Sequence, residues 1–373
     1  MEHTKIEQLA EHGQSVWLDY ISRSLLDSGK LKTLIEQGLR GLTSNPSIFD
    51  KAISTSADYD ERIAHLKREN KSAFEIYDDL TVQDIRDAAD MFKPVYEGSE
   101  GLDGYVSLEV NPKLAYDTAQ TIEEARRLHR TVDRPNVMFK VPSTEKGFPA
   151  IEALLADGIN VNVTLIFSLE QYEHTVQAYM NGIRKRAENN CAISTVRSVA
   201  SVFVSRIDTV IDQQIADRTA SLDGEQKKRL EQLTGRAAVA NSAVIYARYR
   251  ELFRSEEYKE LASSGAHVQR VLWGSTSTKN PSYGDTKYVS ELIAEGTVNT
   301  IPAKTLDAFV DHGQVKNALT EDAATHLQLL EELKAHGIDI TTACAQLLKD
   351  GVIAFEKAFD NLLGAIEDKA SKL

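Results

Sequence analysis

The sequence predicts an α/β protein built as a single (β/α)8 TIM barrel with helical insertions and C-terminal helices. Eight short segments with β-strand character recur along its 373 residues, and segments with helical periodicity separate them. Strands that alternate with helices form parallel sheets, and eight such units are enough to close a barrel. An open, doubly wound sheet is the competing architecture, but neither nucleotide-binding motif of such sheets, G-x-G-x-x-G or G-x-x-x-x-G-K-[ST], occurs here.

The candidate strands are short and rich in branched and aromatic residues, which favour strands. In chain order they are SVWLDY (15–20), LRGLTSNP (39–46), YVSLEV (105–110), VMFKVP (137–142), INVNVTLIF (159–167), VASVFVS (199–205), RVLWGS (270–275) and TIPAKTLDAF (300–309). Long helical stretches lie between the second and third strands, between the sixth and seventh, and after residue 318. These stretches explain a length above the ~250 residues typical of the fold. Because no linker or low-complexity tract divides the chain, we expect one domain over residues 1–373.

Composition excludes several functional classes. The formal net charge of −13 argues against nucleic acid as a partner. The N-terminus lacks the apolar run of a signal peptide and no later segment is long and apolar enough to span a membrane, so we expect a cytoplasmic protein. Two distant cysteines, Cys191 and Cys344, suit a reducing compartment. The final Ser-Lys-Leu spells a peroxisomal signal, which we interpret as a coincidence.

Polar residues inside the candidate strands carry the functional information, because strands covered on both faces should be almost entirely apolar. Side chains alternate along a strand, so in VMFKVP Met138 and Lys140 point one way while Phe139 points toward the packed helices. Lys140 therefore faces the barrel axis. Pro142 places it near the carboxyl end of the strand, where barrel enzymes hold their catalytic residues.

The same alternation turns a polar group inward in other strands. Asp19 shares a face with Trp17, and Asn45 lies at the end of its strand before Pro46. The remaining inward residues of this kind are Ser107, Glu109, Asn162 and Thr164. We expect these side chains to converge at one end of the barrel.

Each of these residues also has a purely structural interpretation. Asp19 or Asn45 alone could form a turn or cap a helix, and Thr164 alone could simply favour a strand. Lys140 could be a structural lysine paired with Glu109 or Asp19. A lysine that faces a barrel interior must either be paired or have its pKa lowered by desolvation. The coincidence of several inward polar residues favours a functional site.

A desolvated lysine amine attacks carbonyl carbons, and the resulting protonated imine accepts the electrons of an adjacent carbanion. This chemistry cleaves C–C bonds without a metal, and the scattered histidines show no ligand spacing, so we expect no metal site. The carboxyls of Asp19 and Glu109 could divide the proton transfers, in an order that the residues leave open. Asn45 and Asn162 could hold substrate hydroxyls.

Two segments could bind a phosphate group. Ser201 and Arg206 follow one another closely at the end of the sixth candidate strand. After the seventh, GSTSTKNP offers hydroxyls, backbone donors and Lys279. Lys279 alone could equally be a solvated surface lysine.

Taken in order, WLDY, GLTSNPSIF, SLEV, FKVP, NVNVTLIFS and VFVSRID resemble the transaldolase family, and its longer bacterial subfamily in particular. The resemblance implies that Lys140 forms the Schiff base, that Asp19 is the acid and base for the C3–C4 bond, and that Glu109 and Thr164 position a catalytic water. The substrate-binding residues that it implies are Asn45, Asn162, Ser201, Phe203 and Arg206.

The implied reaction transfers a dihydroxyacetone unit from sedoheptulose 7-phosphate to glyceraldehyde 3-phosphate, in the non-oxidative pentose phosphate pathway. It needs no cofactor, its partners are sugar phosphates, and the assembly is left open between a monomer and a homodimer. Two positions depart from the family pattern: Lys279 stands where many relatives have an arginine, and Ser201-Val202-Phe203 replaces a commoner Ser-Pro-Phe.

Two other functions stay open. A fructose 6-phosphate aldolase-like enzyme would release free dihydroxyacetone, but such enzymes are shorter and tend to carry an amide and a tyrosine at the positions of Glu109 and Phe203. A non-catalytic barrel could use Lys140, Glu109 and Asp19 as a buried ion network for binding or assembly.

Overall fold

A computed structural model describes residues 3–373 and contains a closed barrel of eight parallel strands. Each strand pairs with the next along the chain, and β8 pairs with β1 to close the ring. The strands are β1 (Gln14–Asp19), β2 (Gly41–Thr43), β3 (Tyr105–Glu109), β4 (Val137–Pro142), β5 (Val161–Ile166), β6 (Ser198–Phe203), β7 (Arg270–Gly274) and β8 (Thr297–Ile301). The predicted (β/α)8 barrel is confirmed.

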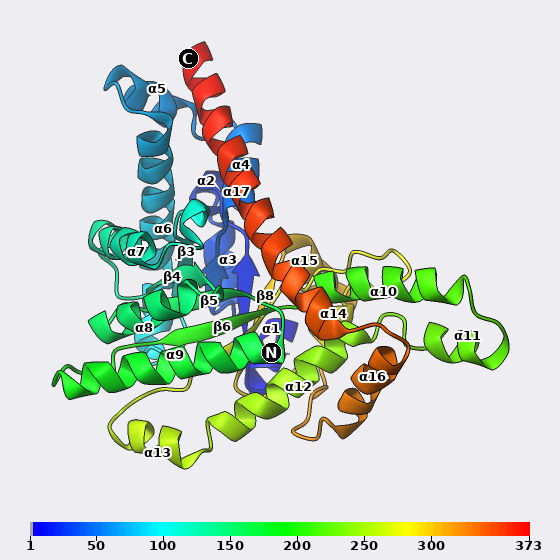
Figure 1. Ribbon diagram of the computed structural model, residues 1–373. Helices are drawn as coiled ribbons and strands as arrows, with labels where there is room; N and C mark the ends of the chain where they lie inside the picture. Colours follow the sequence, from blue (N-terminus) through cyan, green and yellow to red (C-terminus); the bar gives the residue numbers. More distant parts are fainter. Residues whose placement is uncertain (1–2) are drawn as a thin grey trace.

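Helices surround the barrel and form the insertions (Figure 1). Those up to β6 are α1 (Lys5–Glu11), α2 (Arg23–Asp27), α3 (Lys30–Glu36), α4 (Pro46–Thr55), α5 (Asp60–Arg68), α6 (Ala73–Gly98), the 3-10 helix η1 (Pro112–Leu114), α7 (Thr118–Val132), α8 (Gly147–Asp157) and α9 (Leu169–Glu188). Those after β6 are α10 (Ser205–Thr219), α11 (Gly224–Glu231), α12 (Ala237–Leu252), α13 (Glu256–Ser263), α14 (Lys287–Ser290), α15 (Ala303–His312), α16 (Ala324–Ala335) and α17 (Ile340–Lys372).

The eighth strand is the main correction to the predicted elements. Instead of residues 300–309, β8 spans Thr297–Ile301, and the rest of the predicted segment is helix α15. Pro302 separates the two as the N-cap of α15, because proline has no N–H for a ladder bond. Thr305, Leu306 and Phe309 are buried at the spacing of a helix rather than of a strand.

The barrel interior is layered. The layer nearer the amino ends of the strands is apolar and forms a small cluster separate from the outer core: Trp17, Tyr105, Met138, Val199, Leu272 and Val298. Gly41 makes room for it, because a Cβ there would lie 2.6 Å from the Trp17 ring. Two residues further along β1 and β4 come Asp19 and Lys140, so the interior becomes polar toward the carboxyl ends.

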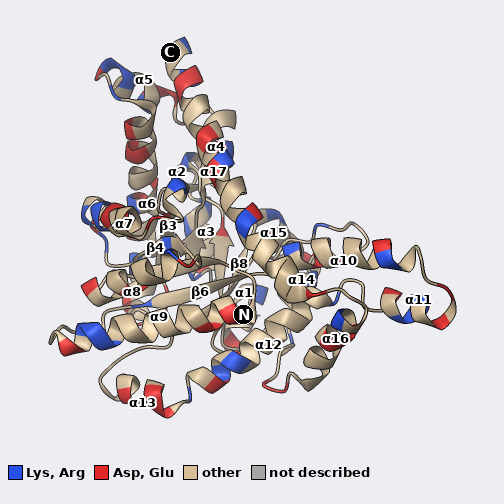
Figure 2. Ribbon diagram, viewed as in Figure 1, with Lys and Arg blue, Asp and Glu red and all other residues tan. Residues whose placement is uncertain are grey.

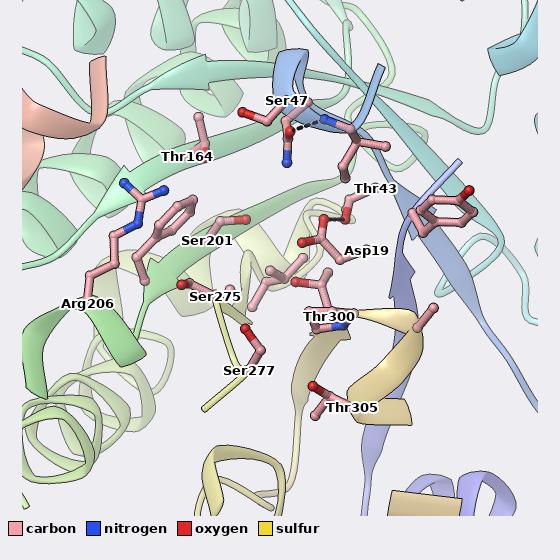
Figure 3. Close-up of a pocket in the computed structure, with 18 of the residues that line it drawn as sticks. Asp19, Thr43, Ser47, Thr164, Ser201, Arg206, Ser275, Ser277, Thr300 and Thr305 are labelled. Carbon is pink, nitrogen blue, oxygen red and sulfur yellow. Dashed lines mark hydrogen bonds between the residues drawn. The ribbon is translucent and has the colours of Figure 1, made fainter. Parts of the chain in front are cut away.

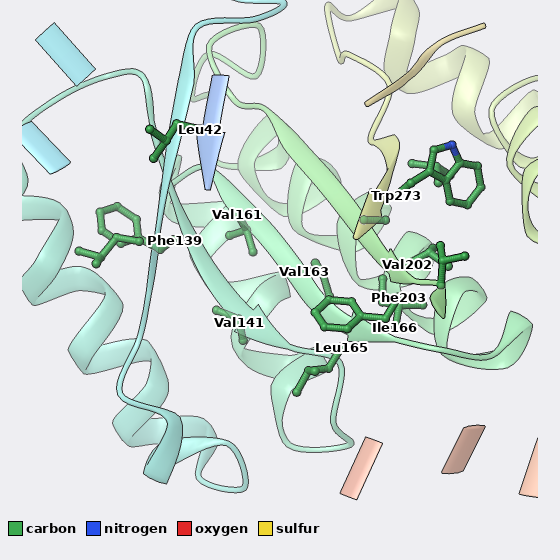
Figure 4. Packing of buried hydrophobic residues seen from close by; sticks show 14 of the residues in the cluster. Leu42, Phe139, Val141, Val161, Val163, Leu165, Ile166, Val202, Phe203 and Trp273 are labelled. Carbon is green, nitrogen blue, oxygen red and sulfur yellow. The ribbon is translucent and has the colours of Figure 1, made fainter. Parts of the chain in front are cut away.

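The outer faces of the strands pack against the helices, as Figure 4 shows for Phe139, Val141 and Val163. Strand β5 is irregular near its end. Val163 pairs with Ala200 but Ile166 pairs with Val202, so β5 carries one residue more than β6 over this interval. Leu165, inside the bulge, has φ +60°, a left-handed conformation rare for a branched residue.

The outer helices carry charges of both signs, and Figure 2 shows acidic and basic residues interspersed along α9 and α11. Within residues 3–373, no helix is long and apolar enough to cross a membrane.

Candidate active site

A cavity of about 590 Å³ opens at the carboxyl ends of the strands (Figure 3). It is lined by eight of the ten predicted site residues: Asp19, Asn45, Lys140, Thr164, Ser201, Phe203, Arg206 and Lys279. The other two, Glu109 and Asn162, lie just beneath its wall, where each contacts a lining residue directly. The structure therefore brings all ten to one end of the barrel.

Lys140 extends from β4 into the barrel and is only 5% exposed. Its Nζ donates to the carbonyl of Ser44 at 3.1 Å and lies 3.2 Å from Oε2 of Glu109 on the adjacent strand β3. Burial raises the pKa of Glu109, and the charge of Lys140 opposes this rise. The lysine is thus paired, as the structural interpretation required, but it also lines an open cavity. Glu109 is thus a carboxyl beside the amine that takes up protons more readily than usual.

Asp19, at the end of β1, lies on the side of the cavity opposite Arg206 (Figure 3). Its Oδ1 accepts a 2.8 Å hydrogen bond from the Thr43 hydroxyl. Burial raises the pKa of Asp19, while the charge of Lys140 and the bond from Thr43 lower it. Its other oxygen accepts no hydrogen bond from residues 3–373. An aspartate with a raised pKa and one such oxygen is suited to take and return a substrate proton.

Strand β5 contributes Asn162 and Thr164, both fully buried. Asn162 donates to the Ser107 hydroxyl at 3.1 Å and accepts from Ser201 at 2.6 Å, so its amide is occupied within the protein. The hydroxyl of Thr164 lines the cavity and has no hydrogen-bond partner among the described residues. A buried hydroxyl of this kind is available to a water or substrate oxygen.

Asn45 has two roles at the start of α4. Its Oδ1 accepts from the Ile48 N–H at 2.9 Å and caps the helix, with Pro46 in the first turn. The side-chain oxygen of Asn45 therefore caps a helix, as the structural interpretation of this residue predicted. Because Asn45 also lines the cavity, its amide nitrogen is left for a ligand.

Arg206 lies in the first turn of α10, with its guanidinium carbon 5.5 Å from the centroid of the Phe203 ring. Burial lowers the pKa of Arg206, and no carboxylate of the described chain acts against this shift. A half-buried guanidinium without a counter-charge favours an anionic ligand.

Lys279 occupies the exposed rim on the loop after β7, where its Nζ donates to the Ser277 hydroxyl at 2.8 Å. Partial burial and the positive charge of Arg206 lower the pKa of Lys279, while Asp19 raises it. Lys279 therefore lies within electrostatic reach of both Arg206 and Asp19. Ser275 in this loop has φ +55°, a strained conformation of the sort found at functional sites.

Sequence reasoning missed several lining residues, among them Thr43, Ser47, Lys51, Thr300, Lys304 and Phe355. Thr300 shares the inward face of β8 with Val298, but the misplaced eighth strand hid this alternation. Phe355 comes from α17, far along the chain, and no local pattern signals that a helical residue will reach a barrel mouth.

Comparisons with known proteins agree with this geometry. The sequence model of the transaldolase/fructose-6-phosphate aldolase family matches residues 16–366. A transaldolase of Trichodesmium erythraeum is 45% identical over 365 residues, covering 97% of this chain and 96% of the relative. A transaldolase 2 of a Nostoc species is 45% identical over 371 residues (98% and 97%), and a transaldolase of Saccharopolyspora erythraea is 45% identical over 369 residues (98% of each). The chain therefore belongs to the transaldolase/fructose-6-phosphate aldolase family.

Proposed function

We propose that the protein is a transaldolase, which moves a dihydroxyacetone unit from sedoheptulose 7-phosphate to glyceraldehyde 3-phosphate and yields erythrose 4-phosphate and fructose 6-phosphate. The main support for this proposal is the position of Lys140, a buried amine that contacts Glu109 at 3.2 Å and still lines an open cavity. Full-length similarity to proteins named transaldolase supports the same function.

The first step forms a covalent bond between Lys140 and the ketose. Transfer of a proton from the amine to Glu109 frees the nitrogen lone pair, which attacks the C2 carbonyl and forms a carbinolamine. Loss of its hydroxyl as water leaves a protonated imine. Glu109 and the unpartnered Thr164 hydroxyl hold the water and the proton that this step moves.

The second step exchanges the aldehydes. Asp19 takes the proton of the C4 hydroxyl, the C3–C4 bond breaks, and its electron pair moves toward the imine to give an enamine. Erythrose 4-phosphate leaves. The enamine carbon then attacks the carbonyl of glyceraldehyde 3-phosphate, and Asp19 returns its proton to the new hydroxyl. Water adds to the imine and releases fructose 6-phosphate from Lys140.

The polar residues of the cavity would orient this substrate. The free amide nitrogen of Asn45 and the Ser201 hydroxyl would bond to sugar hydroxyls. Arg206 and Lys279, at the other side of the cavity, would bind the phosphate. Because Lys279 is a point charge rather than a planar fork, Arg206 supplies most of the directional bonding.

Borohydride reduction in the presence of fructose 6-phosphate tests the function. The expected product is a protein whose intact mass has gained one reduced three-carbon unit, because the reagent reduces the imine irreversibly. Lys140→Ala should give no adduct. Lys51→Ala, which removes another lysine of the same cavity, is the matched control and should retain it.

The dependence of turnover on an acceptor aldehyde distinguishes a transaldolase from an aldolase. Release of erythrose 4-phosphate from sedoheptulose 7-phosphate should continue beyond one turnover only when glyceraldehyde 3-phosphate is added. Wild-type protein that forms no adduct would overturn the proposal, and multiple turnovers without the acceptor would indicate an aldolase instead.

The pH profile of kcat/KM should show an acid limb governed by Asp19. The base works in its ionised form, so the rate falls as pH falls through its pKa, and burial puts this pKa above the ordinary 3.8. Thr43→Val removes a hydrogen bond that lowers the pKa, and therefore should move the limb to still higher pH. Rates measured between about pH 4 and pH 8 check this; a limb that moves down in Thr43→Val would contradict it.

Replacing Arg206 should weaken the use of phosphorylated acceptors selectively. Arg206→Gln removes the guanidinium, and we expect kcat/KM for glyceraldehyde 3-phosphate to fall roughly 100-fold, the equivalent of two charge-assisted hydrogen bonds. Activity with unphosphorylated glyceraldehyde should change much less. Lys279→Arg is the matched control, because it adds a planar fork beside Arg206 and should leave the phosphorylated acceptor well used. Equal losses with both acceptors in Arg206→Gln would exclude a phosphate role.

A further inference from the structure

Helix α17 runs past the mouth of the barrel and contacts elements that are distant in the sequence (Figure 1). It packs against α4, whose N-cap is Asn45, against α10, which carries Arg206, and against β5. Its buried stripe is Ala343, Cys344, Leu347, Gly351, Val352, Phe355, Ala358, Phe359, Leu362, Ile366 and Ala370. One helix thus touches three sides of the candidate site.

Gly351 is the point of closest approach. A Cβ at this position would lie 2.9 Å from Cδ2 of Leu165 and 3.7 Å from Nη1 of Arg206. The first distance is shorter than real Cβ contacts allow, so any side chain at residue 351 would push the Cδ2 end of the buried Leu165 side chain aside. Glycine destabilises a helix interior relative to alanine, and the close packing supplies a reason for it here.

Leu165 is the residue that this contact holds. It lies in the β5 bulge with φ +60°, directly after Thr164, and its side chain is 1% exposed (Figure 4). Its carbonyl accepts hydrogen bonds from the Ser143 hydroxyl at 2.9 Å and from the Gln171 amide at 3.2 Å. A left-handed leucine persists only where its surroundings hold it, and α17 provides the apolar side of that enclosure.

The same helix borders Arg206. The guanidinium lies over Phe203, and Phe355, one turn after Gly351, lines the cavity. Further along the β5–α9 connection, the Phe167 carbonyl accepts from the Asn241 amide at 2.8 Å and faces the thiol of Cys344 at 3.4 Å. The connection after Thr164 is therefore held between α12 and α17.

We propose that Gly351 is a positioning residue of the catalytic site. By lacking a side chain, it lets Leu165 keep the left-handed turn that aims Thr164 into the cavity. This inference rests on the proposed transaldolase function. It assigns to α17 the placement of the Thr164 hydroxyl, through Leu165.

The matched pair Gly351→Ala and Gly364→Ala tests this inference. Both glycines lie within α17, and a Cβ at Gly364 would meet no heavy atom within 4 Å. Each change adds the same methyl group to the same helix. We expect Gly351→Ala to lower kcat/KM for fructose 6-phosphate roughly fivefold or more, since small displacements of aligned groups have large kinetic effects. Gly364→Ala should match the wild type within about twofold.

A double variant tests whether the effect of Gly351→Ala passes through Leu165. Leu165→Ala removes the two Cδ atoms that the new methyl group would meet. If the collision displaces Leu165, adding Gly351→Ala to Leu165→Ala should lower kcat/KM far less than it does in the wild type. Additive effects would overturn the proposal, and so would identical kinetics of Gly351→Ala and Gly364→Ala.

The melting temperature and the borohydride adduct distinguish a failure of this inference from a loss of stability and from a failure of the proposed function. A purely structural role would shift the melting temperature of Gly351→Ala and leave kcat/KM of the folded enzyme unchanged, and this outcome overturns the proposal. If the wild type forms no borohydride adduct, the proposed function itself has failed. If the wild type forms the adduct and turns over while Gly351→Ala behaves like Gly364→Ala, only the role of Gly351 is wrong.

Discussion

Lys140→Met should lower kcat by at least roughly 10⁴-fold, because methionine fills similar space but has no amine to form the imine. No other group can take over this step, since all later bond changes depend on the electron-accepting imine. Turnover of sedoheptulose 7-phosphate with glyceraldehyde 3-phosphate, followed through erythrose 4-phosphate, measures the loss.

The fold of Lys140→Met should survive. Removing the lysine leaves Glu109 buried without its cation, but burial already raises the pKa of Glu109, so the carboxyl can take up a proton instead of remaining charged. Circular dichroism and the melting temperature provide the control. A folded variant that retained more than about a hundredth of wild-type kcat would contradict the assignment of Lys140 as the nucleophile.

Asp19→Asn should lower turnover by about 10³-fold, within the range that a positioned base contributes, yet still form a borohydride adduct, which should carry the whole ketose instead of the three-carbon unit. The amide cannot take the C4 hydroxyl proton, so the C3–C4 bond does not break. Formation of the imine involves Lys140 and Glu109, which contact one another and not Asp19. Steady-state rates and intact mass measured on the same preparation separate the two steps.

Glu109→Gln is the comparison for Asp19→Asn, since it alters the partner of Lys140 and should slow formation of the adduct itself. If Asp19→Asn lost the adduct along with turnover, the two carboxyls would not divide the work in the proposed way.

Side-chain alternation explains why so much of the site could be predicted. A strand places residues two apart on one face, so Lys140 and Asp19 could be assigned to the barrel interior without knowledge of any contact. Closure of eight parallel strands then brings their carboxyl ends together. The roles assigned to these residues remain predictions, because the structure gives their positions and not their chemistry.

Features that depend on distant parts of the chain could not be predicted. The end of β8 is not such a feature, because Pro302 within the segment 300–309 is a local signal that ends the strand at Ile301. The two hydrogen bonds of the Asn162 amide need hydroxyl groups from two other strands, β3 and β6. Phe355 and Gly351 reach the site only because α17 returns across the barrel. Periodicity in a single segment contains none of this information.

Pairing between the first and last strands has a consequence for biosynthesis. Residues Gln14–Leu18 hydrogen-bond to Thr297–Ile301, so one edge of β1 has no partner while most of the chain is being translated. At ribosomal speeds of about 5–20 residues per second, that edge waits on the order of half a minute for β8 to emerge. An unpaired strand edge is a site for aggregation, so nascent chains of this protein should depend on chaperones until the ring closes.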